Sequence, residues 1–426
     1  MNIIHGMNRK STCLPRLIAP RIAGALRHFP VVVLTGARQT GKSTLVSSPP
    51  LGNRRTYRSL DDFDVLERAQ NRPDLLIQEA GRMTLDEVQR APSLLVAIKR
   101  SVDRDRTAGQ FLLTGSQNLL MMRRISETLA GRAVYLTLWP MAESEKSGNP
   151  SPGPWERLLK ARSATAAERI LAAPVVSHPW EKKALAGGYP VPSLQLKASR
   201  RSEWFEGYVR TYLERDLQEV TSVSALADFR RLMRMAALRI GQTLNQTDLA
   251  RDAALSQPTA HRYLNVLETS YQLLRIPAFA ESRTKRLVKS PKLFWTDTGL
   301  ATHLAGYGSQ KELSGTFGGA ILENLVLTQL LAWKETVSPR PEIYYWRTHT
   351  QQEVDFVLEW DRHLLPLEIK RGQRVRLAEI KSLELFLEEH PKLARVGIVL
   401  YGGTEVLRLS DRIVAAPLGH ALGDSQ

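Results

Sequence analysis

The sequence has little cysteine and no long apolar run. Its 426 residues include a single cysteine, Cys13, which cannot form a disulfide within the chain and supplies no metal cluster. The longest apolar stretches, such as 31–34, are far shorter than the ~20 residues that a membrane-spanning helix needs. The basic N-terminal segment is not followed by the apolar core of a signal peptide. We therefore expect a cytoplasmic protein without a membrane partner.

Acidic residues are in deficit relative to basic ones. The chain has 59 Lys and Arg residues against 43 Asp and Glu, a formal net charge of +16. Such an excess favours polyanionic partners, with nucleic acid first among them, although a solvated basic surface is the alternative. The hydrophobic fraction of 43% is that of an ordinary globular protein. At roughly 100 to 200 residues per domain, the length predicts two or three domains.

The stretch LTGARQTGKSTL, residues 34–45, predicts a phosphate-binding loop. It follows the β-branched run 31–34, which is typical of a buried strand in a parallel sheet. Glycines at 36 and 41 let the backbone N–H groups surround phosphates, Lys42 would reach the β- and γ-phosphates, and Ser43 would bind Mg²⁺. The helix that follows adds its positive end to the site. The expected ATP-binding residues are Gly36, Ala37, Arg38, Gln39, Thr40, Gly41, Lys42, Ser43 and Thr44.

Two later stretches supply the partners that a phosphate loop needs. Asp86 and Glu87 follow a short apolar strand, 83–85, and they suit an Mg²⁺-holding carboxylate and a residue that polarises the attacking water. The run 111–114 predicts another buried strand, and Ser116 lies just beyond it. Ligands bind at the carboxyl ends of such strands, so we expect Ser116 to sense the γ-phosphate. The sequence thus predicts an ATPase with ATP and Mg²⁺ at its site.

These stretches carry a family resemblance. FPVVVLTGARQTGKSTL, LDEVQRAPSLL, FLLTGSQNLL and ETLAGRAVYLTLWPM resemble a prokaryotic AAA+-type P-loop ATPase family whose members usually carry a C-terminal restriction-endonuclease-like domain of unknown function. The resemblance covers nearly the whole chain. It implies that Arg132, in LAGR, contacts the γ-phosphate, where a guanidinium would stabilise the separating oxygens; a surface arginine is the alternative.

The middle of the chain predicts a helical region. A Ser-, Pro- and Gly-rich stretch, 144–155, reads as an exposed loop, and a strong helix follows over 204–220. On that helix, Arg210, Arg215 and Asp216 either form ion pairs with their neighbours or reach a nucleotide. We therefore place the end of the ATPase core near residue 150.

Residues 244–279 have the spacing of a helix-turn-helix motif. Thr247 and Ser256 are the expected N-caps of its two helices. The segment 283–292, with five basic residues and no acid, is the expected wing. DNA contact through this segment and through Thr259, His261 and Arg262 is one hypothesis. Contact with a protein, or with the ATPase site, is the alternative.

Near the C-terminus, three predicted strands bring acidic residues together. The strands are 342–347, 352–360 and 363–371. If Asp361 and Arg362 form a two-residue hairpin loop, Asp355 lies directly opposite Glu368, with Cβ atoms roughly 4.5 to 5.5 Å apart. Two facing carboxylates need a cation, so we expect a divalent metal there. Lys370 shares the face and would orient or deprotonate a water, and Glu323 on the preceding helix would complete the ligand set.

This constellation resembles the PD-(D/E)xK nuclease core, except that Val354 stands where a proline often precedes the aspartate. Because domains of one fold differ in function, the resemblance leaves open whether the domain cuts or only binds. The predicted fold class is α/β. It consists of a P-loop NTPase parallel sheet over 1–150, a helical and winged-helix region over 151–310, and a C-terminal α/β nuclease-like domain over 311–426.

The leading functional hypothesis is an ATP-binding and ATP-hydrolysing AAA+-type protein that acts on or near DNA. One alternative is an ATP-gated switch that recruits a protein partner and cleaves nothing. Another is a metal-dependent DNA nuclease regulated by ATP. Besides ATP and DNA, a second copy of the chain is an expected partner.

Overall fold

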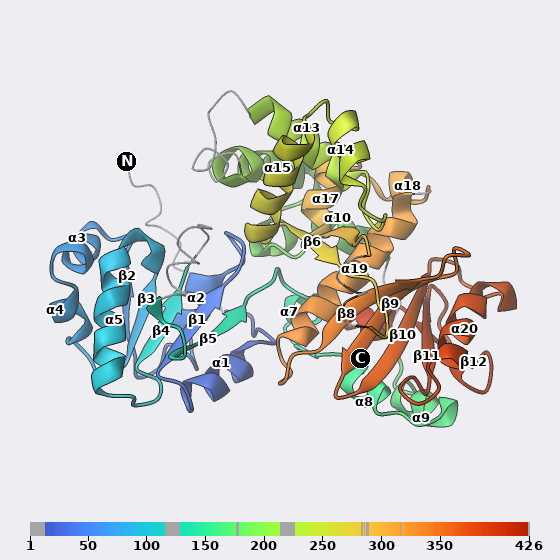
Figure 1. Ribbon diagram of the computed structural model, residues 1–426, viewed down its shortest axis with the longest axis horizontal. Coiled ribbons are helices and arrows are strands. Elements are labelled where there is room, and N and C mark those ends of the chain that lie inside the picture. The colour runs from blue at the N-terminus through green and yellow to red at the C-terminus, as the bar shows by residue number, and fades with distance from the viewer. Residues whose placement is uncertain are drawn as a thin grey trace.

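The computed structural model shows three parts in chain order, an N-terminal sheet, a helical middle and a C-terminal sheet (Figure 1). It describes residues 13–115, 128–175, 179–213, 226–282, 284, 286, 289–315 and 317–424. Within these ranges, no helix has the length and apolarity that crossing a bilayer requires.

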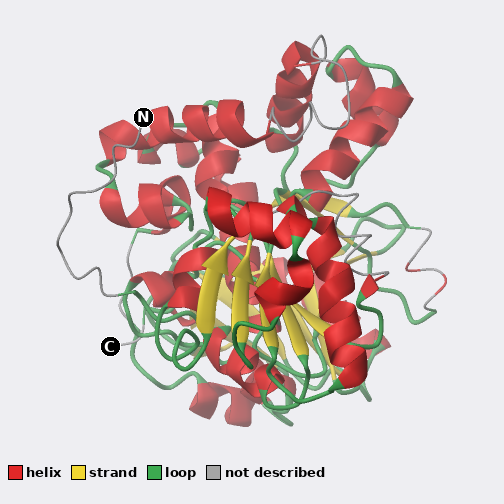
Figure 2. Ribbon diagram, turned by 90° about the vertical axis from the view of Figure 1, so that its left-hand side faces the viewer, coloured by secondary structure: helices red, strands yellow, loops and turns green. Residues whose placement is uncertain are grey.

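The N-terminal part is a five-stranded parallel sheet in the order β2-β3-β4-β1-β5, with helices on both faces (Figure 2). Alternate residues of β1 face two different cores. Val31 and Val33 pack against α3, α4 and α5, whereas Val32 and Leu34 pack against α1 and α2. This burial on both faces explains the continuous apolar run and confirms the predicted P-loop NTPase sheet. The strands are β1 (Val31–Thr35), β2 (Thr56–Ser59), β3 (Met83–Asp86), β4 (Phe111–Thr114) and β5 (Ala133–Thr137), and the helices are α1 (Ala19–Leu26), α2 (Lys42–Ser47), α3 (Phe63–Asn71), α4 (Pro73–Ile77), α5 (Pro92–Arg104) and the 3-10 turn η1 (Val88–Arg90).

The middle part is helical, with one small antiparallel sheet, β6-β7. Ser256 caps α15 as predicted, but the cap of α14 is Asn245, whose side chain accepts from the N–H of Thr247 at 3.0 Å. The prediction that Thr247 is the cap was therefore wrong by two residues. The elements are α10 (Trp180–Ala186), η2 (Val191–Gln195), α11 (Ala198–Tyr208), η3 (Val209–Leu213), α13 (Leu226–Ala237), α14 (Gln246–Asp252), α15 (Gln257–Thr269), β6 (Leu273–Ile276), β7 (Lys292–Trp295), α17 (Thr298–Ala305) and α18 (Gln310–Leu313).

The C-terminal part is a six-stranded mixed sheet in the order β12-β13-β11-β10-β9-β8. It confirms a C-terminal α/β unit with the three predicted strands and the helix before them. The elements are α19 (Phe317–Lys334), β8 (Glu342–Arg347), β9 (Glu353–Trp360), β10 (His363–Lys370), η5 (Leu377–Ile380), α20 (Lys381–Glu389), β11 (Gly397–Tyr401), β12 (Leu407–Arg408), β13 (Ile413–Pro417) and α21 (Gly419–Leu422).

The β9–β10 hairpin has the predicted loop and register. Asp361 and Arg362 have φ angles of 47° and 63°, as a two-residue type I′ turn requires. His363 pairs with Trp360, and the same register continues to Leu367 and Phe356. The next step along both strands brings Asp355 level with Glu368, as predicted.

Two short helices after the ATPase part pack on the C-terminal sheet rather than on the middle helices. They are α8 (Trp155–Leu159) and α9 (Ala164–Ile170), which contact β10, β12 and β13. Arg408 on β12 donates to Glu168 at 2.8 Å, and the Lys160 ammonium lies 4.7 Å from the ring centre of Trp360. The sequence analysis grouped residues 151–310 into one region, whereas these two helices pack with the C-terminal sheet.

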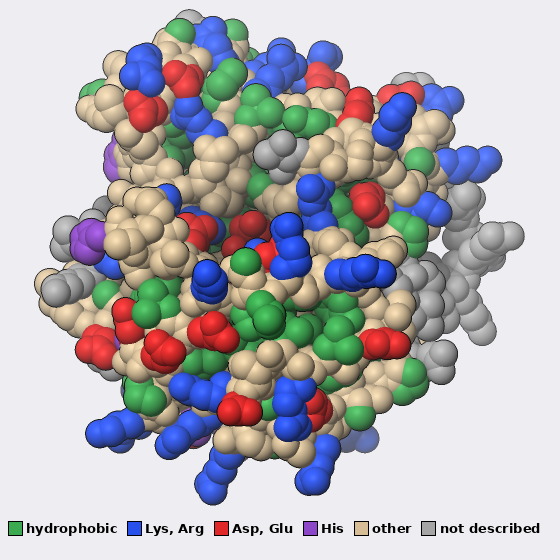
Figure 3. Space-filling model, turned by 90° about the vertical axis from the view of Figure 1, so that its right-hand side faces the viewer, with side chains coloured by type: hydrophobic (Ala, Val, Ile, Leu, Met, Phe, Trp, Pro, Cys, Tyr) green, Lys and Arg blue, Asp and Glu red, His purple; other side chains and the backbone are tan. Residues whose placement is uncertain are grey.

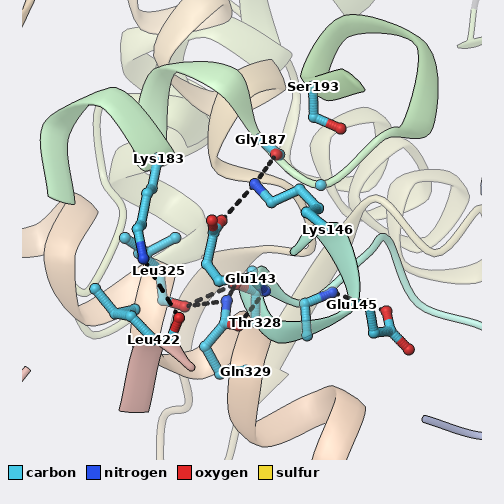
Figure 4. A network of polar contacts seen from close by, with 12 residues as sticks. Glu143, Glu145, Lys146, Lys183, Gly187, Ser193, Leu325, Thr328, Gln329 and Leu422 are labelled. Carbon is cyan, nitrogen blue, oxygen red and sulfur yellow. Dashed lines mark hydrogen bonds and ion pairs between the residues drawn. The ribbon is translucent and has the colours of Figure 1, made fainter. Parts of the chain in front are cut away.

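A short helix, α7 (Glu143–Lys146), joins the three parts (Figure 4). The N–H of Glu143 donates to Gln329 on α19 at 2.8 Å. Lys146 pairs with Glu143 at 2.5 Å and donates to the Gly187 carbonyl, just after α10, at 2.9 Å. The helix that ends the ATPase part is thus bonded to both other parts.

Candidate functional site

The phosphate loop connects the carboxyl end of β1 to the start of α2. Gly36 and Gly41 have φ angles of 141° and 91°, and Gln39 has a φ of 64°. A Cβ added at Gly36 would overlap the carbonyl oxygen of Leu138. Both glycines are therefore required by the backbone, as the sequence predicted.

Lys42 lies across the loop that precedes it. Its side chain is buried, and the ammonium donates to the carbonyls of Gly36 at 3.0 Å and Ala37 at 2.8 Å. Burial lowers the pKa of Lys42 to about 8, while the nearby carboxylates of Glu87 and Asp86 oppose this shift. The structure therefore brings the lysine and the acidic pair together at the carboxyl ends of β1 and β3.

Asp86 is held by side chains from both neighbouring strands. Its carboxylate accepts from the Thr114 hydroxyl, at the end of β4, and from the Tyr57 hydroxyl, on β2, at 2.7 Å. Burial, together with the bond to Asp86, raises the pKa of Tyr57, so the phenol stays a donor. Sequence analysis missed Tyr57, which the parallel register places beside Thr84, two residues before Asp86.

The other expected ligands are less confined. Glu87 has a left-handed φ of 57° and accepts a hydrogen bond from Gln89. Ser43 is exposed in the first turn of α2. The Ser43 hydroxyl and the Asp86 carboxylate are hard oxygen donors, which suits Mg²⁺ that also binds phosphate oxygens and water. Ser116 lies outside the described residues.

Arg132 lies at the amino end of the parallel strands, whereas the phosphate loop lies at their carboxyl end. It precedes β5, whose first residue, Ala133, pairs with the first residue of β1, Val31. Its guanidinium forms two bonds with Asp103, near the end of α5, at 2.5 and 2.9 Å. Within one chain, the structure does not bring Arg132 to the loop. Similarly, Arg210 pairs with Glu206 at 2.8 Å along the helix, which is the simpler of the two alternatives for that residue.

The C-terminal part brings the predicted acidic residues into one cluster. Burial and neighbouring carboxylates raise the pKa values of Glu323, Asp355 and Glu368, that of Glu368 to about 8. One oxygen of Glu368 accepts from Lys370 at 2.7 Å. Asp355 accepts from the N–H of Ile369 at 2.8 Å, across the hairpin. These four side chains therefore lie close together, as the strand register predicted for Asp355, Glu368 and Lys370.

The cations of this acidic cluster are lysines. Lys292, at the start of β7, is almost fully buried and lies 2.5 Å from Glu353 and 3.8 Å from Glu323. In the described part of the chain, no group of three or more His, Cys, Asp or Glu side chains is arranged to hold a metal ion. One oxygen of Glu368 is buried without a hydrogen-bond partner. As arranged, lysines balance the charge of these carboxylates, and the metal site stays a prediction.

The basic segment expected to face DNA is partly turned inward. Besides Lys292, Arg286 packs between the rings of Phe279 and Tyr344, with its guanidinium 4.5 and 4.8 Å from their centres. It also pairs with Glu359 on β9 at 2.6 Å. Sequence analysis placed both residues in the expected wing, for which DNA contact was one hypothesis. The structure corrects this for Arg286 and Lys292, which pair with acids that lie far along the chain.

Comparisons with known proteins match three stretches of this chain to family models. Family models match an AAA domain over residues 28–146 and two domains of unknown function, DUF8612 over 178–311 and DUF4143 over 318–421. A solved Walker-type ATPase, PABY2304 of Pyrococcus abyssi, is 14% identical and covers 71% of this chain and 98% of its own, with a TM-score of 0.46.

Two curated relatives match nearly the whole chain. They are the uncharacterized proteins Mb2031c of Mycobacterium bovis and Rv2008c of Mycobacterium tuberculosis. Each is 32% identical over 408 residues, which is 95% of this chain and 83% of the relative. The AAA-domain match contains the phosphate loop and the Asp86–Glu87 pair. The chain belongs to the same family as Rv2008c and Mb2031c, and its own residues 28–146 match an AAA domain of the P-loop ATPase type.

Proposed function

We propose that the protein binds and hydrolyses ATP with Mg²⁺ and uses this cycle on or near DNA. The observation that carries the ATPase proposal is the position of Lys42, buried across the phosphate loop and close to Asp86 and Glu87. Lys42 would bind the β- and γ-phosphates, and Glu87 would polarise the attacking water. Mg²⁺, held by Ser43 and Asp86, would neutralise charge on the phosphate oxygens.

Two further residues belong to this proposal. Ser116 follows β4, next to β1 in the sheet, and is proposed to sense the γ-phosphate. Arg132 lies at the amino end of the strands of its own sheet, away from the phosphate loop. A γ-phosphate contact by Arg132 would therefore have to reach the nucleotide of a second copy. This role therefore requires a homo-oligomer.

ATP turnover tests the enzyme proposal directly. Lys42→Ala is expected to abolish ATP binding, whereas Glu87→Gln is expected to keep binding and lose turnover. The assay should include Mg²⁺ and a panel of single-stranded, duplex and branched DNAs. If the purified wild type hydrolyses no ATP with or without DNA, the ATPase proposal fails. Binding with slow turnover that no DNA stimulates would favour the protein-recruiting switch.

The proposal of DNA as partner rests on the net charge of +16 and on helix α15, where His261 and Arg262 are exposed. Figure 3 shows basic side chains projecting from the C-terminal side of the molecule, interspersed with acidic ones. Duplex phosphates attract such side chains, and the affinity then falls steeply with salt. A DNA affinity that does not depend on salt would contradict this partner.

Cleavage of DNA by the C-terminal part is the second candidate function. The register of the β9–β10 hairpin, which continues to bring Asp355 level with Glu368, favours it, and Lys370 lies beside them. The ion pairs of Lys292 count against it, because a divalent metal would have to displace them. Under this alternative, the wild type nicks plasmid DNA with Mg²⁺ and Asp355→Ala does not. A wild type that nicks no plasmid, single strand or branched DNA would leave a binding domain.

A further inference from the structure

The carbonyl oxygens of the phosphate loop are held by side chains from several parts of the protein. Lys42 holds the carbonyls of Gly36 and Ala37. The next held carbonyl, that of Arg38, accepts from the Tyr208 hydroxyl at 3.3 Å, and that of Thr40 accepts from the Arg16 guanidinium at 2.8 Å. Arg16 and Tyr208 lie outside the sequence motif of the loop, so neither was expected there.

Holding a carbonyl also orients the next N–H group. The peptide unit is planar and trans, so its C=O and N–H bonds point in opposite directions. A donor on Arg38 O therefore turns the N–H of Gln39 away from Tyr208. In the same way, a donor on Thr40 O turns the N–H of Gly41 away from Arg16. Successive N–H groups that point to one side form a concave anion-binding nest.

Arg16 is fixed by three bonds to three segments. Besides Thr40, it donates to the Trp139 carbonyl at 2.7 Å and to Glu145 at 3.0 Å. Both members of the Arg16–Glu145 pair are buried, with side chains 6% and 3% exposed. Glu145 is itself held by the N–H groups of Leu17 and Ala142, at 2.6 and 2.9 Å. The guanidinium therefore has little freedom to leave the loop.

Tyr208 approaches the loop from the middle part. It lies at the end of α11 and is 3% exposed. Its oxygen accepts from the Gln272 amide at 3.0 Å and lies 3.0 Å from the Tyr189 hydroxyl. Tyr189 donates instead to the Gln272 oxygen at 3.0 Å. Tyr208 thus contacts the loop, whereas the hydrogen bonds of the Tyr189 hydroxyl lead to Gln272 and Tyr208.

We propose that Arg16 and Tyr208 are positioning residues of the phosphate loop, which align the N–H groups of Gly41 and Gln39 for the triphosphate. This inference rests on the proposed ATP function. Pre-organised donors bind tightly because little ordering remains to be done on binding. Loss of either donor therefore weakens ATP binding without removing any group that touches ATP.

Tyr208→Phe tests the hydroxyl alone, because it keeps the packed ring. Loss of one neutral hydrogen bond is expected to raise the Kd for a fluorescent ATP analogue about two- to tenfold. KM is expected to rise with it, while kcat at saturating ATP changes less, because ground-state binding is affected. Tyr189→Phe is the matched control and should keep the Kd within about twofold.

Arg16→Ala tests the charged donor and permits chemical rescue. It is expected to raise the Kd more than about tenfold, and millimolar guanidinium should restore much of the affinity. Arg55→Ala is the control. Arg55 donates to the carbonyls of Gly109 and Gln110 at 2.7 and 3.2 Å, just before β4, at the end of the strands away from the phosphate loop. It should lower stability and leave the Kd unchanged.

The outcomes separate the two proposals. A wild type that binds no ATP overturns the proposed function and this inference together. A wild type that binds ATP, with Tyr208→Phe equal to it in Kd and KM, overturns the role of Tyr208. An unchanged Kd in Arg16→Ala, or a raised Kd that guanidinium does not lower, overturns the role of Arg16. If Arg16→Ala does not fold, Tyr208→Phe still decides whether carbonyl donors position the loop.

Discussion

Burial makes the charge of Lys42 depend on pH within an accessible range. Removal of its ammonium from water by burial lowers its pKa to about 8, despite the nearby Glu87 and Asp86 and the two loop carbonyls that accept from it. The lysine of the phosphate loop therefore loses its positive charge at a lower pH than a solvent-exposed lysine does.

We predict that ATP affinity falls as pH rises through about 8. Below this pKa the lysine is charged and attracts the phosphates, and above it the amine is neutral. Bound phosphate favours the charged form, so the midpoint in the complex should lie above the value for the free protein. Equilibrium binding of ATP from pH 7 to pH 10 measures this, above the range where phosphate itself titrates. A constant affinity over this range would contradict it.

Lys292 shows why a sequence can misplace a charge. Within its own segment it belongs to a run of basic residues, which predicts a solvated face. Its partners, Glu323 and Glu353, lie on α19 and β9 and meet it only after the strands assemble. The same reason applies to Arg286 and its partner Glu359.

Lys292→Met should strongly destabilise the protein. Removing this buried cation leaves the partly buried carboxylates of Glu323 and Glu353 without it, which costs up to about 3 to 5 kcal/mol of unfolding free energy. Urea denaturation followed by tryptophan fluorescence measures the loss. Lys289→Met, in the same segment but exposed, should stay within about 0.5 kcal/mol of the wild type. Adding Glu353→Gln should recover part of the loss, and a Lys292→Met protein as stable as the wild type would contradict this account.

At the scale of elements, α15 and the segment before β7 differ in what their basic residues can reach. Arg262 on α15 is exposed, while Arg286 is enclosed by Phe279, Tyr344 and Glu359. We therefore predict that Arg262→Ala weakens DNA binding and lowers the salt slope by about 1. Arg286→Ala should lower stability and leave that slope unchanged. Fluorescence anisotropy with a labelled duplex between 50 and 200 mM salt distinguishes the two variants. A lower salt slope in Arg286→Ala and an unchanged one in Arg262→Ala would show that the wing contacts DNA.

Elements governed by local rules could be predicted from the sequence. The phosphate loop needs glycines at fixed places, and a two-residue turn fixes the whole β9–β10 register, so both came out as expected. The packing of α8 and α9 on the C-terminal sheet could not be predicted, because it depends on apolar contacts between distant segments. The position of Arg132 could not be predicted either, since its motif gives no information on the end of the strands at which it lies.

At the scale of the whole molecule, the three parts are joined by buried contacts rather than by linkers alone. One apolar core continues from the middle helices into the C-terminal sheet and includes Phe229, Trp295 and Leu365. The ATPase part has separate cores on the two faces of its sheet. Its connection to the rest depends more on polar contacts, among them those of α7 and the Tyr208–Arg38 bond.

This arrangement predicts that Gln329 couples the ATPase part to the remainder. Gln329→Ala leaves the buried N–H of Glu143 without its acceptor, at a cost of about 1 to 3 kcal/mol (Figure 4). In the wild type, we expect one calorimetric transition that ATP shifts as a whole, by about 2.7 kcal/mol at 100 times Kd. In Gln329→Ala, we expect two transitions, of which ATP shifts only one. Glu342→Ala, which removes an exposed pair with Lys334, is the control and should unfold like the wild type. A single transition in Gln329→Ala with the full ATP shift would show that α7 does not couple the parts.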